Sequence, residues 1–199
     1  MRAYLWPMQR LAVLDNIDSF THNLVHRLEP MVEQVIVIRN DDPKAMNRIA
    51  SCDALLLSPG PGLPEESGCL MDVLDAFHGK MPILGICLGM QALAQHAGAR
   101  LLPLSEAMHG RVAHIQQVNG SPDWLAGISL PLDVGLSHSW AVDDKTLPDS
   151  ILPQAWSHQG VLMALSIPDK KSVGLQFHPE SVMTPDGDTI LQAWVNSLS

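Results

Sequence analysis

The chain has 199 residues, 46% of them hydrophobic and 17% charged, which is typical of one packed domain and too apolar for a disordered chain. Its net charge of −9 and its 12 scattered basic residues argue against a nucleic-acid partner, because phosphate binding requires clustered Lys and Arg. No apolar run approaches the length of a membrane-spanning helix, and the N-terminus lacks the apolar stretch of a secretory signal. We therefore expect no association with a membrane.

Three cysteines, Cys52, Cys69 and Cys87, form no CxxC pair, so they suit neither a disulfide framework nor a zinc site. This usage favours a reducing, cytoplasmic location. Residues 1–199 contain no repeat and no linker, and we expect them to form a single domain. Residues 1–7 precede the first predicted strand and are interpreted as a candidate N-terminal extension.

The first half of the chain alternates strand-like and helix-like patterns. In chain order these are a strand at 10–15, a helix with Phe20, Leu24, Val25 and Leu28 on one face, a strand at 34–40, a short helix after Pro43, a strand at 53–58, a helix with Leu70, Val73, Leu74 and Phe77 on one face, a strand at 82–86 and a helix at 88–97. Such alternation predicts a parallel sheet with helices on both faces. The strands are almost entirely apolar, as expected where both faces are covered.

After residue 99 the pattern changes to strand-like stretches separated by short turns. The stretches 130–142, 154–167 and 172–178 suggest antiparallel additions, and residues 187–198 read as a final amphipathic helix. The predicted fold class is α/β, an open and mostly parallel sheet flanked by helices with additional short antiparallel strands.

Ligand sites in such sheets lie beyond the carboxyl ends of the strands. Three unusual stretches fall there: DNIDSFT (15–21), SPGPGLPEESG (58–68) and GICLG (85–89). The site is therefore expected where these three stretches meet.

Within GICLG, Cys87 lies between two glycines where a strand changes abruptly into a helix. Glycines at 85 and 89 relieve the backbone crowding of such a turn, as in the G-x-S-x-G elbow of hydrolases. The start of a helix favours a thiolate over a thiol. The N–H of Leu88 and a glycine N–H from the loop Gly60-Pro61-Gly62 are candidate donors to an oxyanion.

A nucleophilic cysteine requires a base, and His178 is the candidate because it ends an apolar strand in GLQFHPES (174–181). Glu180 can accept a hydrogen bond from one imidazole nitrogen and leave the other facing Cys87. The alternatives are that Cys87 is a buried core thiol and that His178 caps a strand. His22 and His26 lack a further ligand at metal spacing. His109, His114, His138 and His158 are expected at the surface or in loops.

Taken together, DNIDSFTHNL, SPGPGLPEESG, PILGICLGMQAL and QFHPES resemble the class I (triad) glutamine amidotransferases, from about residue 10 to the C-terminus. The likeness is greatest to the small subunit of anthranilate synthase and its relative in aminodeoxychorismate synthase. The resemblance implies a flavodoxin-like open sheet and hydrolysis of L-glutamine to glutamate and ammonia through a cysteine thioester.

The resemblance also implies roles for individual residues: catalytic, Cys87, His178 and Glu180; oxyanion-binding, Gly60 and Leu88; substrate-binding, Gly60, Pro61, Gly62, Gln91, Ser139 and Trp140; metal-binding, none. No cofactor is implied in this chain. Ammonia would pass to a chorismate-binding large subunit, which also holds Mg²⁺.

Two departures from the family pattern affect the expected glutamine clamp and partner surface. Leu136, Ser137 and Trp140 replace Arg, Tyr and Leu of the usual R-Y-H-S-L, and Arg111 replaces the Lys of H-G-K. DNIDSFT and SPGPGLPEESGC favour the anthranilate branch over the aminodeoxychorismate branch, and a subunit that serves both is a further interpretation. A non-catalytic binding protein and a redox sensor on the same fold are alternatives from other classes.

Overall fold

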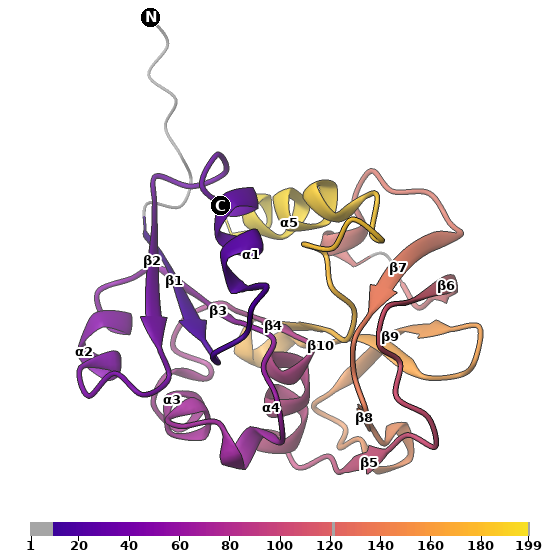
Figure 1. Cartoon of the computed structure of the whole chain (residues 1–199), viewed down its shortest axis with the longest axis horizontal. Helices are drawn as coiled ribbons and strands as arrows, with labels where there is room; N and C mark the ends of the chain where they lie inside the picture. Colours follow the sequence, from indigo (N-terminus) through magenta and orange to yellow (C-terminus); the bar gives the residue numbers. More distant parts are fainter. Residues whose placement is uncertain (1–9, 121, 199) are drawn as a thin grey trace, which may run out of the picture.

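The computed structural model describes residues 10–120 and 122–198. The candidate extension at residues 1–7 lies outside this part of the chain. The described segments fold into a central sheet with helices on both faces (Figure 1).

The alternation of strands and helices predicted for the first half is confirmed. The elements run β1 (Arg10–Asp15), α1 (Thr21–Leu28), β2 (Gln34–Arg39), α2 (Ala45–Ile49), β3 (Ala54–Leu57), α3 (Leu70–Phe77), β4 (Ile83–Ile86) and α4 (Leu88–His96). The second half continues with β5 (Leu101–Pro103), β6 (Arg111–Val118), β7 (Leu132–Leu136), β8 (Trp140–Val142), β9 (Leu152–Ser157), β10 (Leu162–Ile167), β11 (Ser172–Leu175) and α5 (Gly187–Asn196).

Nine strands form one sheet in the order β2-β1-β3-β4-β11-β10-β9-β6-β7. The pairs β2–β1, β1–β3, β3–β4 and β4–β11 are parallel, and the remaining pairs are antiparallel. The predicted fold class is therefore confirmed. One detail differs, because β11 is antiparallel to β10 but parallel to β4, so it belongs to the parallel half as well.

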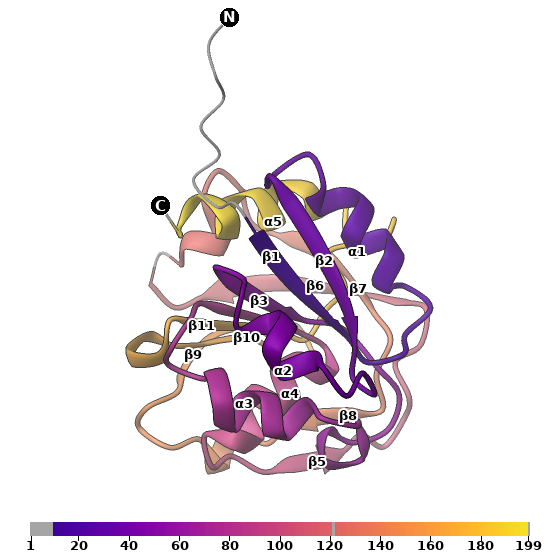
Figure 2. The same cartoon turned by 90° about the vertical axis from the view of Figure 1, so that its left-hand side faces the viewer.

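Alternate side chains of the parallel strands enter two separate cores. In β1, Leu11 and Val13 pack beneath α1 and α5, whereas Ala12 and Leu14 pack against α2, α3 and α4. The views in Figures 1 and 2 show these two groups of helices on opposite faces of the sheet. Burial on both faces explains why these strands are apolar at most positions.

Several elements differ from the sequence prediction. Phe20 lies before α1 and is 47% exposed, so it does not share the buried face formed by Leu24 and Leu28. The sequence pattern also does not predict β6, because this strand lacks a regular alternation of buried and exposed residues. Its apolar Val112 is 41% exposed, and a register shift follows Ile115. Within residues 10–120 and 122–198, no helix is both long and apolar enough to cross a membrane.

Candidate active site

The carboxyl ends of the parallel strands β1, β3, β4 and β11 lie on the same side of the sheet. Each of these strands is followed there by one of four sequence stretches. DNIDSFT follows β1, the PGPG loop follows β3, Cys87 follows β4 and QFHPES follows β11. The Cys87 N–H donates to the Leu175 carbonyl at 2.7 Å, which joins two of these strand ends directly. The three stretches selected from the sequence therefore meet, together with the histidine-bearing stretch.

Cys87 has φ +52° and ψ −103°, a backbone conformation that L-residues rarely adopt. A Cβ on Gly85 would overlap the backbone of Gly89, and a Cβ on Gly89 would overlap the Leu57 carbonyl. The two glycines are thus required by the close approach of α4 to β3 and β4. Such strain is typical of a residue held for function.

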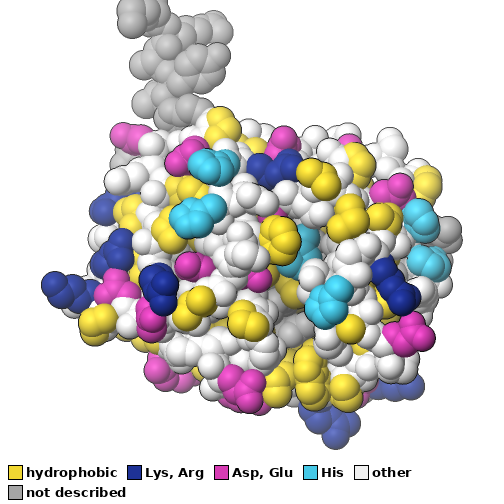
Figure 3. Space-filling view, in the orientation of Figure 1, with side chains coloured by type: hydrophobic (Ala, Val, Ile, Leu, Met, Phe, Trp, Pro, Cys, Tyr) yellow, Lys and Arg dark blue, Asp and Glu magenta, His cyan; other side chains and the backbone are white. Residues whose placement is uncertain are grey.

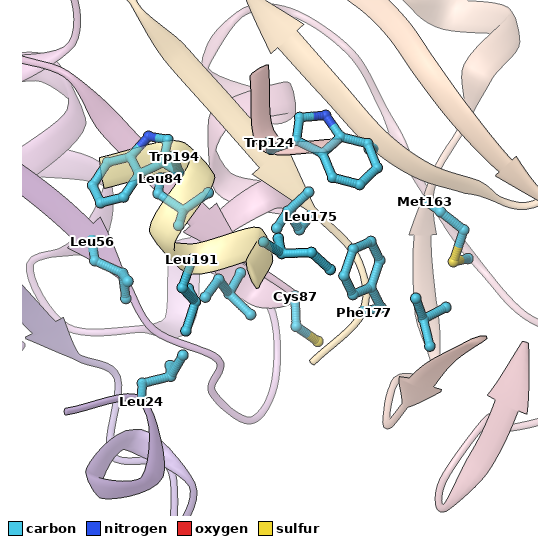
Figure 4. Packing of buried hydrophobic residues seen from close by; sticks show 14 of the residues in the cluster. Leu24, Leu56, Leu84, Cys87, Trp124, Met163, Leu175, Phe177, Leu191 and Trp194 are labelled. Atoms are coloured by element: carbon cyan, nitrogen blue, oxygen red, sulfur yellow. The ribbon is translucent and has the colours of Figure 1, made fainter. Parts of the chain in front are cut away.

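The Cys87 side chain is 5% exposed and packs in the apolar cluster that includes Leu175, Phe177 and Leu191 (Figure 4). Its sulfur also has two polar neighbours. The thiol donates to the Ser137 carbonyl at 3.8 Å, and the sulfur accepts from Nε2 of Gln176 at 3.6 Å. The thiol is therefore both buried and hydrogen-bonded, unlike a cysteine that only fills a core.

His178 and Glu180 form a buried pair, 5% and 3% exposed, in the loop after β11. Nδ1 of His178 lies 2.6 Å from Oε1 of Glu180, which assigns the proton on Nδ1 to this bond. Within the described residues, the buried Nε2 of His178 has no hydrogen-bond partner of standard geometry. The loop itself is anchored by Thr184, which donates to the His178 carbonyl at 2.7 Å.

The pKa of His178 is raised from 6.5 to about 10. Burial alone lowers this pKa, but hydrogen bonding and charge interaction with Cys87 and then Glu180 outweigh burial and favour the imidazolium. Because Nδ1 is bonded to Glu180, Nε2 is the imidazole nitrogen left for the interaction with Cys87.

We expect Glu180→Gln to lower the pKa of His178, because the substitution removes one of the two groups that favour the imidazolium. A raised pKa stabilises the fold below the ordinary value of 6.5, and the contribution is lost as pH rises through about 10. The loss in free energy of unfolding caused by Glu180→Gln should therefore shrink as pH rises across this window. Titration of His178 by NMR checks the expected fall in its pKa, and urea unfolding at several pH values checks the pH-dependent loss of stability. An unchanged His178 titration would contradict the prediction.

The PGPG loop lies against the start of α4. A Cβ on Gly60 would come within 2.6 Å of Leu88 Cδ2 and 2.7 Å of Asn16 Cβ, so only glycine allows this approach. Asn16 is 2% exposed and holds Ser58, the residue before the loop, since its backbone N–H donates to Ser58 Oγ and its Nδ2 to the Ser58 carbonyl, both at 2.9 Å. Gly60 and Leu88 are thus neighbours.

Gln91 is 3% exposed and lies in α4, one turn after Cys87. Its Nε2 donates to the Trp140 carbonyl at 2.9 Å and to Oε1 of Gln176 at 3.1 Å. Nδ1 of His138 lies 2.8 Å from the same Trp140 carbonyl. The turn from Ser139 to Trp140 is thus held beside α4.

Three of the predicted substrate-binding residues, Pro61, Gly62 and Ser139, are exposed. Ser139 Oγ lies 3.5 Å from Nε2 of His109. A cavity of about 260 Å³ opens beside His178 and Glu180, and its lining includes Phe20 and Val182. Phe20 and Val182 thus lie beside the His178–Glu180 pair, and Ser139 lies beside His109.

Three residues of the site are missed by sequence reasoning: Asn16, His138 and Gln176. His138 lies in the loop between β7 and β8, within the surface-or-loop expectation, but it is only 4% exposed, and burial lowers its pKa. Gln176 is fully buried, although it stands in the same QFHPE stretch that identifies His178. A polar residue inside an apolar strand end is the signal that could have selected it.

In the described part of the chain, no group of three or more His, Cys, Asp or Glu is arranged to hold a metal ion. His26 instead pairs with Glu29 at 3.5 Å on the surface. Cys52, Cys69 and Cys87 are all free thiols. On the face shown in Figure 3, Lys and Arg side chains are interspersed with Asp and Glu rather than gathered in one patch.

Comparison with known proteins gives a family match and relatives of nearly full length. The family model described as Glutamine amidotransferase class-I matches residues 12–198. Anthranilate synthase component 2 of Lactococcus lactis subsp. lactis is 37% identical over 192 residues, which cover 95% of each chain. Aminodeoxychorismate synthase component 2 of Serratia marcescens is 38% identical over 192 residues, which cover 94% of this chain and 99% of that protein.

Among solved structures, a GMP synthase subunit from Thermoplasma acidophilum superimposes with a TM-score of 0.83. It is 26% identical, and the match covers 96% of this chain and 94% of that chain. The similarity therefore extends over the sheet and both layers of helices.

Proposed function

The chain belongs to the class I glutamine amidotransferase family, and from this premise we propose that it is the glutaminase subunit of an anthranilate or aminodeoxychorismate synthase. The observation that carries the proposal is the buried set of Cys87 on its strained turn, the unpartnered Nε2 of His178, and Glu180 on Nδ1. A non-catalytic relative or a redox sensor would not require all three.

In the proposed first half-reaction, the Cys87 sulfur attacks the side-chain amide carbon of glutamine. The carbonyl oxygen becomes an oxyanion, for which the N–H groups of Gly60 and Leu88 are the candidate donors. His178 then gives its Nε2 proton to the departing nitrogen, the C–N bond breaks, and ammonia leaves a γ-glutamyl thioester on Cys87. Glu180 keeps the imidazole oriented throughout.

In the second half-reaction, His178 accepts a proton from a water molecule as the water oxygen attacks the thioester carbonyl. The C–S bond breaks, glutamate is released, and the Cys87 sulfur returns to its starting state. No cofactor or metal in this chain takes part in the proposed sequence, and the Mg²⁺ site is assigned to the large subunit.

The α-amino and α-carboxylate ends of glutamine are assigned to Gln91 and to the backbone of Ser139 and Trp140. Support comes from the Nε2 of Gln91, which is committed to the Trp140 carbonyl and Gln176, whereas Oε1 accepts no hydrogen bond from a described residue. That oxygen is a suitable acceptor for an ammonium group. Pro61 and Gly62 would form the outer wall of the site.

A chorismate-binding large subunit is the proposed partner and the recipient of ammonia. Val182 and Phe20 support docking at the mouth of the site, because these apolar side chains are 90% and 47% exposed beside the His178 cavity. The three free cysteines suit a reducing cytoplasmic compartment. Of the two synthases we favour anthranilate synthase, hence tryptophan biosynthesis, on the motifs DNIDSFT and SPGPGLPEESGC.

The test is to copurify and assay the chain with each candidate large subunit, supplying glutamine or ammonia as the nitrogen source. We expect a stable complex and glutamine-dependent anthranilate formation with the anthranilate partner. Glutamine-dependent activity only with the aminodeoxychorismate partner would reassign the pathway, and activity with both would identify a shared subunit. Failure to activate glutamine with either would contradict the proposed function.

A further inference from the structure

Gln176 is a fully buried polar side chain that directly follows β11, between Cys87 and Gln91. Burying an amide without hydrogen bonds is costly, and both ends of this amide are bonded. Oε1 accepts from Nε2 of Gln91 at 3.1 Å, and Nε2 lies 3.6 Å from the Cys87 sulfur. The amide therefore connects the thiol to the residue assigned to substrate binding.

The orientation of Gln176 follows from a backbone group that cannot change its role. The Trp140 carbonyl only accepts, so Gln91 must present its NH₂ group to it at 2.9 Å. The second hydrogen of that NH₂ group then requires an acceptor, which is Oε1 of Gln176. As a consequence, the NH₂ group of Gln176 has to face the sulfur.

We propose that Gln176 is a positioning residue that donates a hydrogen bond to the Cys87 thiolate and holds the sulfur for attack. A donor bonds an anion about twice as strongly as a neutral acceptor, so this contact favours the thiolate over the thiol. The sulfur loses its negative charge in the thioester, and the contact weakens at that stage. The inference rests on the proposed glutaminase function and deepens it.

The test compares Gln176→Glu and Gln176→Leu with the unsubstituted chain, each in complex with its large subunit. The ionised side chain in Gln176→Glu can accept from Gln91 but cannot donate to the sulfur, whereas Gln176→Leu removes both contacts. Gln192→Glu is the matched control, since it makes the same chemical change on α5, where the amide donates to Oδ1 of Asn196 at 3.0 Å.

The first measurement is the pH dependence of Cys87 alkylation by iodoacetamide, followed by mass spectrometry of the Cys87 peptide. In Gln176→Glu we expect the half-maximal rate to move up by about one pH unit, a tenfold loss of thiolate at a given pH. The second measurement is glutamine hydrolysis, where kcat should fall by about 10- to 100-fold while KM changes by less than about threefold. The alkylation profile should shift less in Gln176→Leu than in Gln176→Glu, and it should not shift in Gln192→Glu.

An alkylation profile within 0.2 pH units of the unsubstituted chain (about a 1.6-fold change in thiolate) overturns the proposal, whatever happens to kcat. If the buried substitutions prevent folding, NMR of the unsubstituted chain with nitrogen-15-labelled glutamine side chains replaces them. The Gln176 amide resonances should then shift as Cys87 deprotonates, and a constant resonance overturns the proposal. Alkylation requires no glutamine, so failure of the glutaminase assignment would be recognised separately, by the absence of glutamine-dependent activity with either large subunit.

Discussion

Cys87→Ala should reduce glutamine-dependent synthesis by about 10⁶-fold, the order of magnitude found when a triad loses its nucleophile. Alanine offers no atom that can attack the amide carbon, and a water molecule would have to replace the sulfur. Ammonia-dependent synthesis should remain, because the large subunit then receives ammonia from solution. Both rates can be measured in one complex by exchanging the nitrogen source.

The fold should tolerate Cys87→Ala, because alanine is no more strained than cysteine at a positive φ and is smaller. Cys52→Ala is the matched control, since Cys52 is also a free thiol but lies after α2, in the core beneath α2 and α3. It should keep both activities. Glutamine-dependent synthesis that survives Cys87→Ala would show that the nucleophile is wrongly assigned.

His178→Asn should cost nearly as much as Cys87→Ala, because a triad acts as a unit and losing either member disables it. Asparagine can still donate to the buried Glu180, so the variant avoids leaving that carboxylate without its partner. It cannot take up and return a proton at the position of Nε2. In His178→Asn, glutamine hydrolysis by the complex should fall by about 10⁵- to 10⁶-fold. In Glu180→Gln it should fall by about 10⁴-fold.

The double variant Cys87→Ala with His178→Asn should be no slower than Cys87→Ala alone. His158→Ala, which removes an exposed histidine near the end of β9, should leave the rate unchanged. Additive losses in the double variant would indicate that His178 does not act through Cys87. Retention of more than about one per cent of the rate in His178→Asn would contradict its role as acid and base.

Much of this site could be predicted from the sequence because its chemistry is concentrated at strand ends. PILGICLGMQAL places a cysteine between two glycines, and the structure explains both glycines by backbone overlaps that any Cβ would create. His178 and Glu180 stand two residues apart, so their contact is local and could be expected. The convergence of the ends of β1, β3 and β4 followed from the parallel order, which alternating strands and helices impose.

What could not be predicted depends on neighbours distant in sequence. A strand such as β11 has the same apolar pattern whether its neighbour runs parallel or antiparallel, so its pairing with β4 is not encoded in its periodicity. His138 reads as a loop residue, and its sequence gives no sign that it is buried with Nδ1 2.8 Å from the Trp140 carbonyl. Gln176 is informative only once Cys87 and Gln91 are known to flank it.

The most direct test of the proposed glutaminase mechanism is to detect the thioester on Cys87. The complex is mixed with isotopically labelled glutamine, quenched in acid during turnover and digested, and the Cys87 peptide is examined by mass spectrometry. We predict a labelled γ-glutamyl group on Cys87 that forms in the unsubstituted chain and is absent from Cys87→Ala. Turnover of glutamine with no acyl group on Cys87, or with the group on another residue, would contradict the proposed mechanism.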